Sequence, residues 1–194
     1  MNGKEIGSFS GTDLVISEGI SNQVINLQAS GSGSLYYFWE MEGIPMNMAD
    51  KQEDSYLKVR KTFYDRFGHE VTGKAFLQND LIVVKLSLQA LDFNASVENV
   101  AVADILPAGL EIENPRIGAI PELAWIKDAS GYDYLDVRDD RITFFTTATG
   151  TSKNYYYVVR AVSKGLFNMG PVSADAMYNG EYHSYWGAGT VMVK

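Results

Sequence analysis

The segment from Leu81 to Leu91 alternates between apolar and polar side chains, and this period of two constrains the fold more than any other feature of the chain. Val84, Leu86, Leu88 and Ala90 are the apolar members, and Lys85, Ser87 and Gln89 are the polar ones. Successive side chains of a β-strand point to opposite faces, so one face lies in a core and the other in water. The pattern therefore predicts a strand of an antiparallel sheet, which keeps one face solvated.

Further short runs of this kind occur along the chain and are separated by Gly, Asn, Asp or Pro, and no segment reads as a long amphipathic helix. They lie at Leu14–Ile16, Gln23–Gln28, Leu35–Met41, Tyr56–Tyr64, Val100–Ile105, Arg141–Thr147, Tyr155–Val162 and Val172–Met177. Many short strands with turns between them predict an all-β protein built as an antiparallel β-sandwich.

The breaks between the runs predict where the strands turn. Asp139-Asp140 can bond its own backbone and is expected to form a hairpin corner, as are Asn79-Asp80 and Gly165. Pro107-Ala108-Gly109 joins a fixed φ to a residue that can take positive φ, so it is expected to end the preceding strand sharply.

Composition argues against several classes of function. The 16 basic and 24 acidic residues give a net charge of -8, which repels phosphate backbones and anionic lipid. The chain has no cysteine, which excludes disulfides, thiolate nucleophiles and iron–sulfur clusters. No apolar run is long enough to span a membrane, and the first residues lack the apolar segment of a secretory signal. We therefore expect no nucleic-acid partner and no membrane insertion by this segment.

Acidic residues are the first candidates for catalysis. Glu111 and Glu113 are two residues apart, which puts both carboxylates on one face of a strand, as acid–base chemistry could require. Glycosidases usually take their two carboxylates from different elements, so a solvated strand face is the preferred interpretation. Asp136, Asp139 and Asp140 lack the spacing and the glycine of a calcium loop, and a hairpin turn explains them better.

The two histidines of the chain, His69 and His183, form neither a His-x-x-x-His nor a His-x-His motif. A serine nucleophile would need one of them as its base, yet the chain has no Gly-x-Ser-x-Gly or Ser-x-x-Lys motif. The segment Gly31–Ser34 lacks the lysine of a phosphate-binding loop. These observations predict a protein that is not an enzyme and holds no cofactor and no metal ion.

Aromatic residues are abundant, with 12 Tyr, 9 Phe and 3 Trp. In a strand, Tyr155–Tyr157 must point to alternating faces, so at least one ring meets solvent or a partner. Tyr182, Tyr185 and Trp186 cluster near the end, as on sugar-stacking surfaces, but such rings also line domain interfaces and cap sandwich cores. Trp125 lies among isoleucine and leucine residues and is expected to be at least partly buried.

Four short motifs between Asp104 and Tyr178 occur in an order that resembles a known family. They are Asp104–Arg116 (DILPAGLEIENPR), Arg138–Arg141 (RDDR), Tyr157–Val162 (YVVRAV) and Ala176–Tyr178 (AMY). Together they resemble the last macroglobulin-like domain of the bacterial alpha-2-macroglobulins, which are large periplasmic protease-trapping proteins. Four motifs in the order of the family are much harder to match by chance than any one of them.

The resemblance implies a macroglobulin-like sandwich of immunoglobulin- or fibronectin-like architecture, and it implies a site. In thioester-containing members of the family, the matching Met-Tyr pair lies against the thioester domain and shields the reactive bond until a protease cuts the bait region. Met177 and Tyr178 are thus implied to bind that domain, the thioether excluding water and the phenol donating a hydrogen bond. The alternative is that both side chains simply fill the sandwich. The chain departs from many relatives in having Gly180, where they have proline, after Asn179.

The resemblance also implies how the chain is divided. It covers Tyr56 to the end, whereas the polar segment Gly43–Asp54 has no periodicity and reads as a linker or long loop. We expect residues 1–48 to be the closing strands of the preceding β-domain. Residues 49–194 are expected to form the C-terminal macroglobulin-like domain, of the MG10 type.

A non-catalytic scaffold role in a protease inhibitor follows from the resemblance. The expected partners are the thioester domain and the neighbouring β-domains of the same precursor, with target proteases met only indirectly. The expected location is the periplasm or cell envelope, within an exported, lipid-anchored precursor. A carbohydrate-binding or adhesin-type β-sandwich module is the competing interpretation, because fold alone does not separate the two. A segment of a family member without a thioester is the third.

Overall fold

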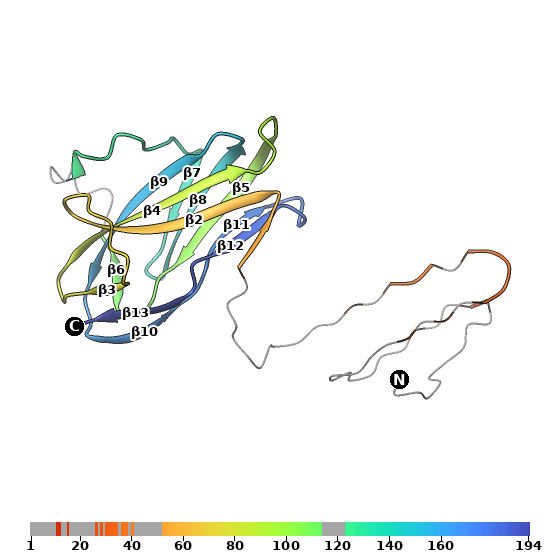
Figure 1. Cartoon of the computed structure of the whole chain (residues 1–194), viewed down its shortest axis with the longest axis horizontal. Helices are drawn as coiled ribbons and strands as arrows, with labels where there is room; N and C mark the ends of the chain where they lie inside the picture. The colour runs from red at the N-terminus through yellow and green to blue at the C-terminus, as the bar shows by residue number, and fades with distance from the viewer. Residues whose placement is uncertain are drawn as a thin grey trace. The chain divides into compact units, whose positions relative to one another are not determined.

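The computed structural model of the chain describes residues 52–113 and 123–194, together with positions 11, 12, 15, 26, 28, 30–34, 36–38 and 40. Contacts between Cα atoms divide the chain into two compact units, Met1–Met46 and Asn47–Lys194. In the first unit, residues 31–33 form a bend in which Gly31 and Gly33 have positive φ. The second unit is built from β-strands throughout its described part (Figure 1), so the predicted all-β class is confirmed.

The strands of the second unit are numbered in chain order. They are β1 (Glu53–Ser55), β2 (Leu57–Asp65), β3 (Ala75–Phe76), β4 (Leu81–Ala90), β5 (Ser96–Ile105), β6 (Leu110–Ile112), β7 (Tyr134–Val137), β8 (Arg141–Thr149), β9 (Lys153–Ala161), β10 (Gly165–Met169), β11 (Val172–Ala176), β12 (His183–Trp186) and β13 (Gly189–Val193). Among the described residues, no helix is both long enough and apolar enough to cross a membrane.

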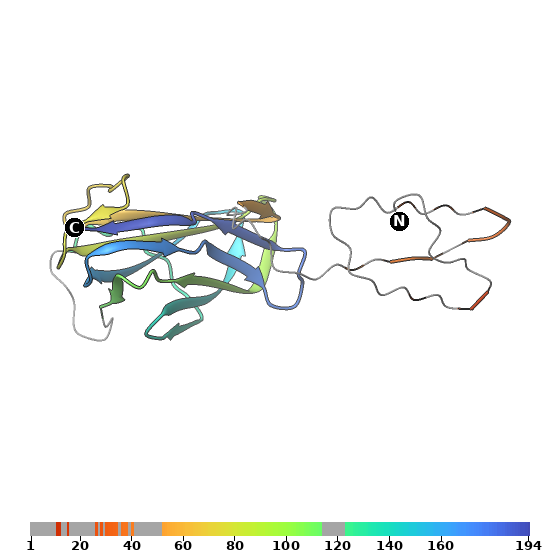
Figure 2. The same cartoon turned by 90° about the horizontal axis from the view of Figure 1, so that it is seen from below.

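The strands form a sandwich of two main sheets (Figures 1 and 2). One sheet has six strands in the order β1-β12-β11-β5-β8-β7, and the other has four in the order β2-β4-β9-β6. A smaller sheet has the order β10-β13-β3. Among the described strands, neighbours are antiparallel apart from β13 and β3, which are parallel. The predicted antiparallel sandwich is therefore the observed architecture.

The core lies between the two main sheets and is filled by the alternate residues of each strand. Leu86 and Leu88 of β4 are fully buried, as the period of two predicted. The rings of Phe144 on β8 and Tyr155 on β9 stack with centroids 5.1 Å apart, which joins the six-stranded sheet to the four-stranded one. Tyr156 points to the opposite face from its neighbours in the sequence, as predicted. Apolar burial of this extent is the main stabilising contribution in a sandwich of this size.

The predicted breaks fall between strands at Asp139-Asp140, Asn79-Asp80 and Pro107–Gly109, but Gly165 is the first residue of β10. The hairpin corners predicted at Gly165 and at Asn79-Asp80 are wrong, because β9 and β10 lie in different sheets and so do β3 and β4. Asp139 and Asp140 form the corner between β7 and β8, and Pro107–Gly109 separates β5 from β6. Asn79 takes positive φ, and Asp80 accepts a hydrogen bond through Oδ2 from Leu77 N at 2.7 Å between β3 and β4. These side chains replace backbone partners that the turn cannot supply.

Several sequence-based bounds differ from the structure; for example, the strand predicted at Val100–Ile105 begins at Ser96. The predicted linker Gly43–Asp54 is wrong at its end, because Glu53 and Asp54 belong to β1 and pair with β12. The predicted strand Val172–Met177 ends one residue early, at Ala176. The strands predicted before residue 48 lie mostly outside the described residues, and the assignment of residues 1–48 to a preceding β-domain stays a prediction.

Candidate functional site

The turn between β11 and β12 runs from Met177 to Tyr182 and carries both residues of the predicted binding surface. Its first residue is tied to β5, because Met177 N donates to Asn99 O at 3.0 Å. The turn also closes on itself, since Tyr182 N donates to Asn179 O at 3.1 Å and Glu181 N donates to Asn179 Oδ1 at 3.1 Å. Asn favours such turns because its side chain substitutes for a backbone acceptor. The turn therefore has a defined shape.

The corner between β1 and β2 supports this turn from one side. Ser55 Oγ donates to Glu181 O at 2.6 Å. Tyr56 has φ of 57°, and its ring stacks on Tyr182 with centroids 4.7 Å apart. A positive φ at a tyrosine is unfavourable, so the stacking and the hydrogen bond help to hold the corner in this conformation. Tyr56 was not predicted to lie at this corner, because no local sequence pattern predicts a positive φ at residues other than Gly, Asn or Asp.

Met177 and Tyr178 project from the turn into solvent. Their exposed fractions are 52% and 84%, so they do not fill the core, and the alternative stated for them above is wrong. The chemistry that they can offer a partner is a flexible apolar thioether and a phenolic donor.

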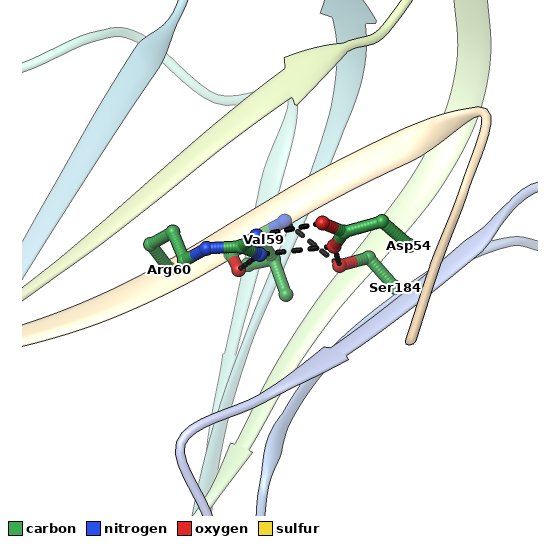
Figure 3. A network of polar contacts seen from close by, with 4 residues as sticks. All are labelled: Asp54, Val59, Arg60 and Ser184. Atoms are coloured by element: carbon green, nitrogen blue, oxygen red, sulfur yellow. Dashed lines mark hydrogen bonds and ion pairs between the residues drawn. The ribbon is translucent and has the colours of Figure 1, made fainter. Parts of the chain in front are cut away.

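Asp54 anchors β1 through a network of polar contacts (Figure 3). Its carboxylate accepts hydrogen bonds from Arg60 Nη1 at 2.9 Å, from Arg60 Nη2 at 2.6 Å and from Ser184 Oγ at 2.7 Å. Ser184 Oγ in turn accepts from Val59 N at 2.9 Å. The hydrogen bonds from Arg60 lower the pKa of Asp54 below its usual value. The network ties β1 to β2 and β12, and thus fixes the corner that carries Tyr56.

A second polar group lies inside the sandwich. Lys61 Nζ donates to Asp104 Oδ1 at 2.7 Å, and Tyr157 O–H donates to Asp104 Oδ2 at 2.7 Å. The side chains of Lys61 and Asp104 are 3% and 0% exposed, so no substrate reaches them. Burial, with the nearby Asp104 carboxylate, raises the pKa of Tyr157 well above its usual value. The Asp that opens the first motif therefore has a structural role.

Three of the predicted acidic candidates, Glu113, Asp136 and Asp140, form ion pairs. Glu113 Oε1 accepts a hydrogen bond from Arg160 Nε. Glu111 is paired with Arg160 in the β6–β9 ladder and lies on the solvent face of β6. Asp136 pairs with Arg138 at 2.9 Å, and Asp140 pairs with Arg141 at 2.8 Å, across the β7–β8 corner. These contacts agree with the interpretation of the carboxylates as a solvated face and a hairpin turn.

The two histidines serve local contacts. His69 Nδ1 lies 2.9 Å from Asp65 Oδ2, and His183 Nδ1 donates to Gly180 O at 2.9 Å. In the described residues, no group of three or more His, Cys, Asp and Glu side chains is arranged to hold a metal ion. Neither imidazole is placed beside a serine hydroxyl by any described contact.

Trp125 is half-buried, as predicted, but on the outer face of the four-stranded sheet instead of in the main core. Its Nε1–H donates to Arg66 O at 3.2 Å, and its ring lies 5.5 Å from that of Tyr64 and 6.3 Å from that of Tyr156. Burial and the hydrogen bond to Asp128 raise the pKa of Tyr156 to about 12. These contacts hold the segment that includes Trp125 and Asp128 against the four-stranded sheet.

The aromatic cluster near the end of the chain is divided among separate contacts. Tyr182 stacks on Tyr56, the Tyr185 O–H donates to Asp175 Oδ1 at 2.7 Å, and the Arg60 guanidinium lies 4.3 Å from the centre of the Trp186 ring. Each ring is engaged within the domain. The three rings therefore have different partners within the domain.

Comparisons with known proteins identify relatives of this chain. The family model described as the bacterial alpha-2-macroglobulin MG10 domain matches residues 57–181, a range that includes the Met177–Tyr178 pair. An alpha-2-macroglobulin of Xylella fastidiosa (strain Temecula1) is 30% identical over 159 residues, which cover 76% of this chain and 9% of that protein. An alpha-2-macroglobulin of Rickettsia conorii is 26% identical over 194 residues, which cover 98% of this chain and 10% of that protein.

A solved structure supports the fold. Escherichia coli alpha-2-macroglobulin activated by porcine elastase superimposes with a TM-score of 0.69 and 21% identity, over 78% of this chain and 14% of that one. The chain spans about a tenth of the length of the curated relatives that it matches, 9% and 10% of them.

Proposed function

The chain belongs to the bacterial alpha-2-macroglobulin family, with an MG10 domain at residues 57–181, and we propose that it is a non-catalytic scaffold that shields the thioester domain of a longer protease inhibitor. The observation that carries the proposal is the exposure of Met177 and Tyr178 on a turn of defined shape. Exposed apolar side chains on a rigid element are typical of protein contact surfaces.

The chemistry of the two side chains suits a shield. The Met177 thioether can adapt to an irregular surface and exclude water, and the Tyr178 O–H can orient a neighbouring group through one hydrogen bond. Water admitted to an activated acyl group hydrolyses it irreversibly, so exclusion of water preserves the reactive bond. The carboxylates and histidines described above are engaged in structural contacts, which supports a role without catalysis.

The wider setting of the domain is part of the same proposal. The partners would be the thioester domain and the neighbouring β-domains of the parent protein, and target proteases would be met only through the whole inhibitor. The parent protein would lie in the periplasm or cell envelope. Fractionation by osmotic shock tests the location, and recovery of the parent protein in the cytosolic fraction would contradict it.

The competing sugar-binding module has weaker support. It would need exposed aromatic faces that act together, whereas Tyr182, Tyr185 and Trp186 are each engaged with another residue of the domain. Polysaccharide binding by the chain that is lost on Trp186→Ala would favour the module instead.

The test uses the full-length protein and methylamine, a small amine that reacts with an accessible thioester. The double variant Met177→Ala, Tyr178→Ala is expected to take up methylamine at least about tenfold faster than the parent before any protease is added. The reason is that loss of one hydrogen bond and one water-excluding contact is worth roughly 1.4 kcal/mol or more. The measurement is the rate of incorporation of labelled methylamine.

A matched control replaces the same residue types elsewhere on the surface. The double variant Met192→Ala, Tyr134→Ala removes a thioether and a phenol whose exposed fractions are 41% and 62%. It should leave the rate of methylamine uptake unchanged. Equal rates in parent and site variant, with folding intact, would contradict shielding by this pair. A parent protein without a Cys-Gly-Glu-Gln motif and without amine uptake would leave only the scaffold role.

A further inference from the structure

The β11–β12 turn contains an Asn-Gly sequence, Asn179-Gly180, and both residues are exposed. Asparagine is chemically labile, because the backbone nitrogen of the next residue can attack its side-chain amide. Glycine permits this attack best, since it has no Cβ to crowd the ring that closes. The other Asn-Gly sequence of the chain, Asn2-Gly3, lies outside the described residues. The geometry of the β11–β12 turn therefore decides how reactive Asn179 is.

The nitrogen that would attack belongs to Gly180, the second residue of a β-turn. Asn179 and Tyr182 are the outer residues of this turn, because Tyr182 N donates to Asn179 O at 3.1 Å. Among the described residues, no acceptor lies on the Gly180 N–H. No described atom lies within 4 Å of a Cβ placed on Gly180. The described fold thus leaves the Gly180 nitrogen unengaged, and the space beside it is open.

Two hydrogen bonds of the turn lie where negative charge develops during such an attack. Glu181 N donates to Asn179 Oδ1 at 3.1 Å, which folds the carboxamide back along its own backbone and polarises the carbon that is attacked. Tyr182 N donates to Asn179 O, the carbonyl of the peptide group that contains Gly180 N. This bond stabilises the peptide anion that forms when Gly180 N loses its proton. Donors aimed at developing charge lower an activation barrier.

Contacts from neighbouring strands hold the turn in this arrangement. Ser55 Oγ donates to Glu181 O at 2.6 Å, and His183 Nδ1 donates to Gly180 O at 2.9 Å. The carbonyls on both sides of the Gly180–Glu181 peptide link are therefore fixed by other elements. A reacting pair that is already held in place loses less entropy on the way to the transition state.

We propose that Asn179 is a site of spontaneous deamidation, in which Gly180 N closes a succinimide ring on Asn179 Cγ. The bond from Gly180 N to Asn179 Cγ forms and the Gly180 proton passes to a solvent base. The side-chain nitrogen of Asn179 takes up a proton and leaves as ammonia. Water then opens the ring at either of its two carbonyls, which gives an aspartyl residue or an isoaspartyl residue. The two steps consume one water molecule and need no oxidant.

Either product changes the turn beside Tyr178. Both put a new carboxylate on an exposed turn of a chain whose net charge is already -8. The isoaspartyl product also adds one atom to the backbone, because the chain then runs through Cβ of residue 179. The site is therefore a slow chemical modification of the turn that presents Met177 and Tyr178. The reaction needs neither a thioester nor a second domain, so it is independent of the shielding role.

Peptide mapping by mass spectrometry tests the proposal on the full-length protein, kept folded in warm, mildly alkaline buffer. Asn179 should convert to the acid, and an isoaspartyl carboxyl methyltransferase should methylate the isoaspartyl product. Gly180→Pro removes the attacking N–H at a turn position that favours proline, and it should abolish the conversion. Gly180→Ala keeps the N–H but adds a Cβ, and it should slow the conversion at least about tenfold. Asn94, which precedes Ala95 in the exposed β4–β5 loop, is the internal control and should stay intact.

A synthetic peptide with the sequence of residues 176–184 is the reference for the contribution of the fold. Because the folded turn already supplies both donors, Asn179 should convert at least as fast in the protein as in the peptide. Slower conversion in the protein than in the peptide would show that the turn protects Asn179, and it would overturn the proposal. Equal conversion in Gly180→Pro and in the parent would also overturn it, because the amide would then be hydrolysed directly. Circular dichroism checks the folding of both variants, and Gly180→Ala carries the test if Gly180→Pro does not fold.

Discussion

Lys61 and Asp104 form an ion pair inside the sandwich, and the Tyr157 hydroxyl completes the hydrogen bonding of the carboxylate. Removal of two charges from water is costly, and the mutual attraction offsets this cost only when the geometry is good and the remaining lone pairs are satisfied. Lys61 and Asp104 meet both conditions, because their hydrogen bond is 2.7 Å long and Tyr157 donates to the second carboxylate oxygen. The pair joins β2, β5 and β9 across the two main sheets, so it contributes to the specific pairing of the sheets as well as to stability.

Removal of one member of this pair should be strongly destabilising. Asp104→Ala leaves an uncompensated buried ammonium and an unpaired phenol, at a cost of about 3–5 kcal/mol. The double variant Lys61→Met, Asp104→Leu should cost clearly less than the sum of the two single variants, because it removes both charges. Urea unfolding of the parent, Asp104→Ala, Lys61→Met, Asp104→Leu and the double variant measures these values. A cost for Asp104→Ala below about 1 kcal/mol would contradict the burial of the charge.

The Asp54 carboxylate gives the domain a defined response to acid. Its folded-state pKa is lowered by the hydrogen bonds from Arg60, so it stabilises the fold above its unfolded-state pKa of about 3.9. That contribution is lost as the pH falls through the folded-state value. Asp54→Asn should therefore reduce the slope of unfolding free energy against pH below about pH 4, whereas Asp139→Asn in the β7–β8 turn should not. An unchanged slope in Asp54→Asn would contradict the network.

Some elements of the domain could be predicted from sequence, and others could not. The alternation of residues along the sequence predicted β4 and β9, because each of these strands has one apolar face. β1 could not be found in this way, since Glu53-Asp54-Ser55 is polar throughout and is held by Arg60 and Ser184 from distant strands. The same holds for β12, where the buried residue is a serine with polar partners.

The candidate site, like the fold, could be predicted from the sequence only in part. The Ala176–Tyr178 motif predicted Met177 and Tyr178 as site residues, which stays a prediction, but it did not predict whether their side chains are buried. The strand period continues through Ala176 and suggests one more strand residue, whereas the bond from Met177 N to Asn99 O begins the turn. The Tyr56 ring stacks on Tyr182 beside this turn, and no sequence pattern connects Tyr56 with the motif.

The segment that includes Trp125 and Asp128 is an element whose anchoring can be measured. Trp125→Ala removes a half-buried ring, its hydrogen bond to Arg66 O and its contacts with Tyr64 and Tyr156. A fully buried Trp costs about 3–5 kcal/mol when truncated, so a half-buried one should cost about half of that. Trp125→Phe should recover much of the loss. A melting temperature of Trp125→Ala equal to that of the parent would refute the packing of this segment.

At the scale of the whole molecule, a series of internal contacts leads to the turn that carries Met177 and Tyr178. The charged and polar groups described above hold strands together. The Asp54 network fixes the β1–β2 corner, and that corner supports the β11–β12 turn. The scaffold role proposed for the domain depends on this series, because the turn exposes both side chains.

The most direct test of this account is photo-crosslinking from position 178 of the full-length protein. Tyr178 is replaced by p-benzoylphenylalanine, which keeps an aromatic ring at the site, and the protein is irradiated before any protease is added. Mass spectrometry then identifies the attached peptide. The account predicts peptides of the thioester domain at this position and none from the matched replacement at Tyr134. Cross-links from position 178 confined to its own domain, or formed to any region other than the thioester domain, would contradict the account.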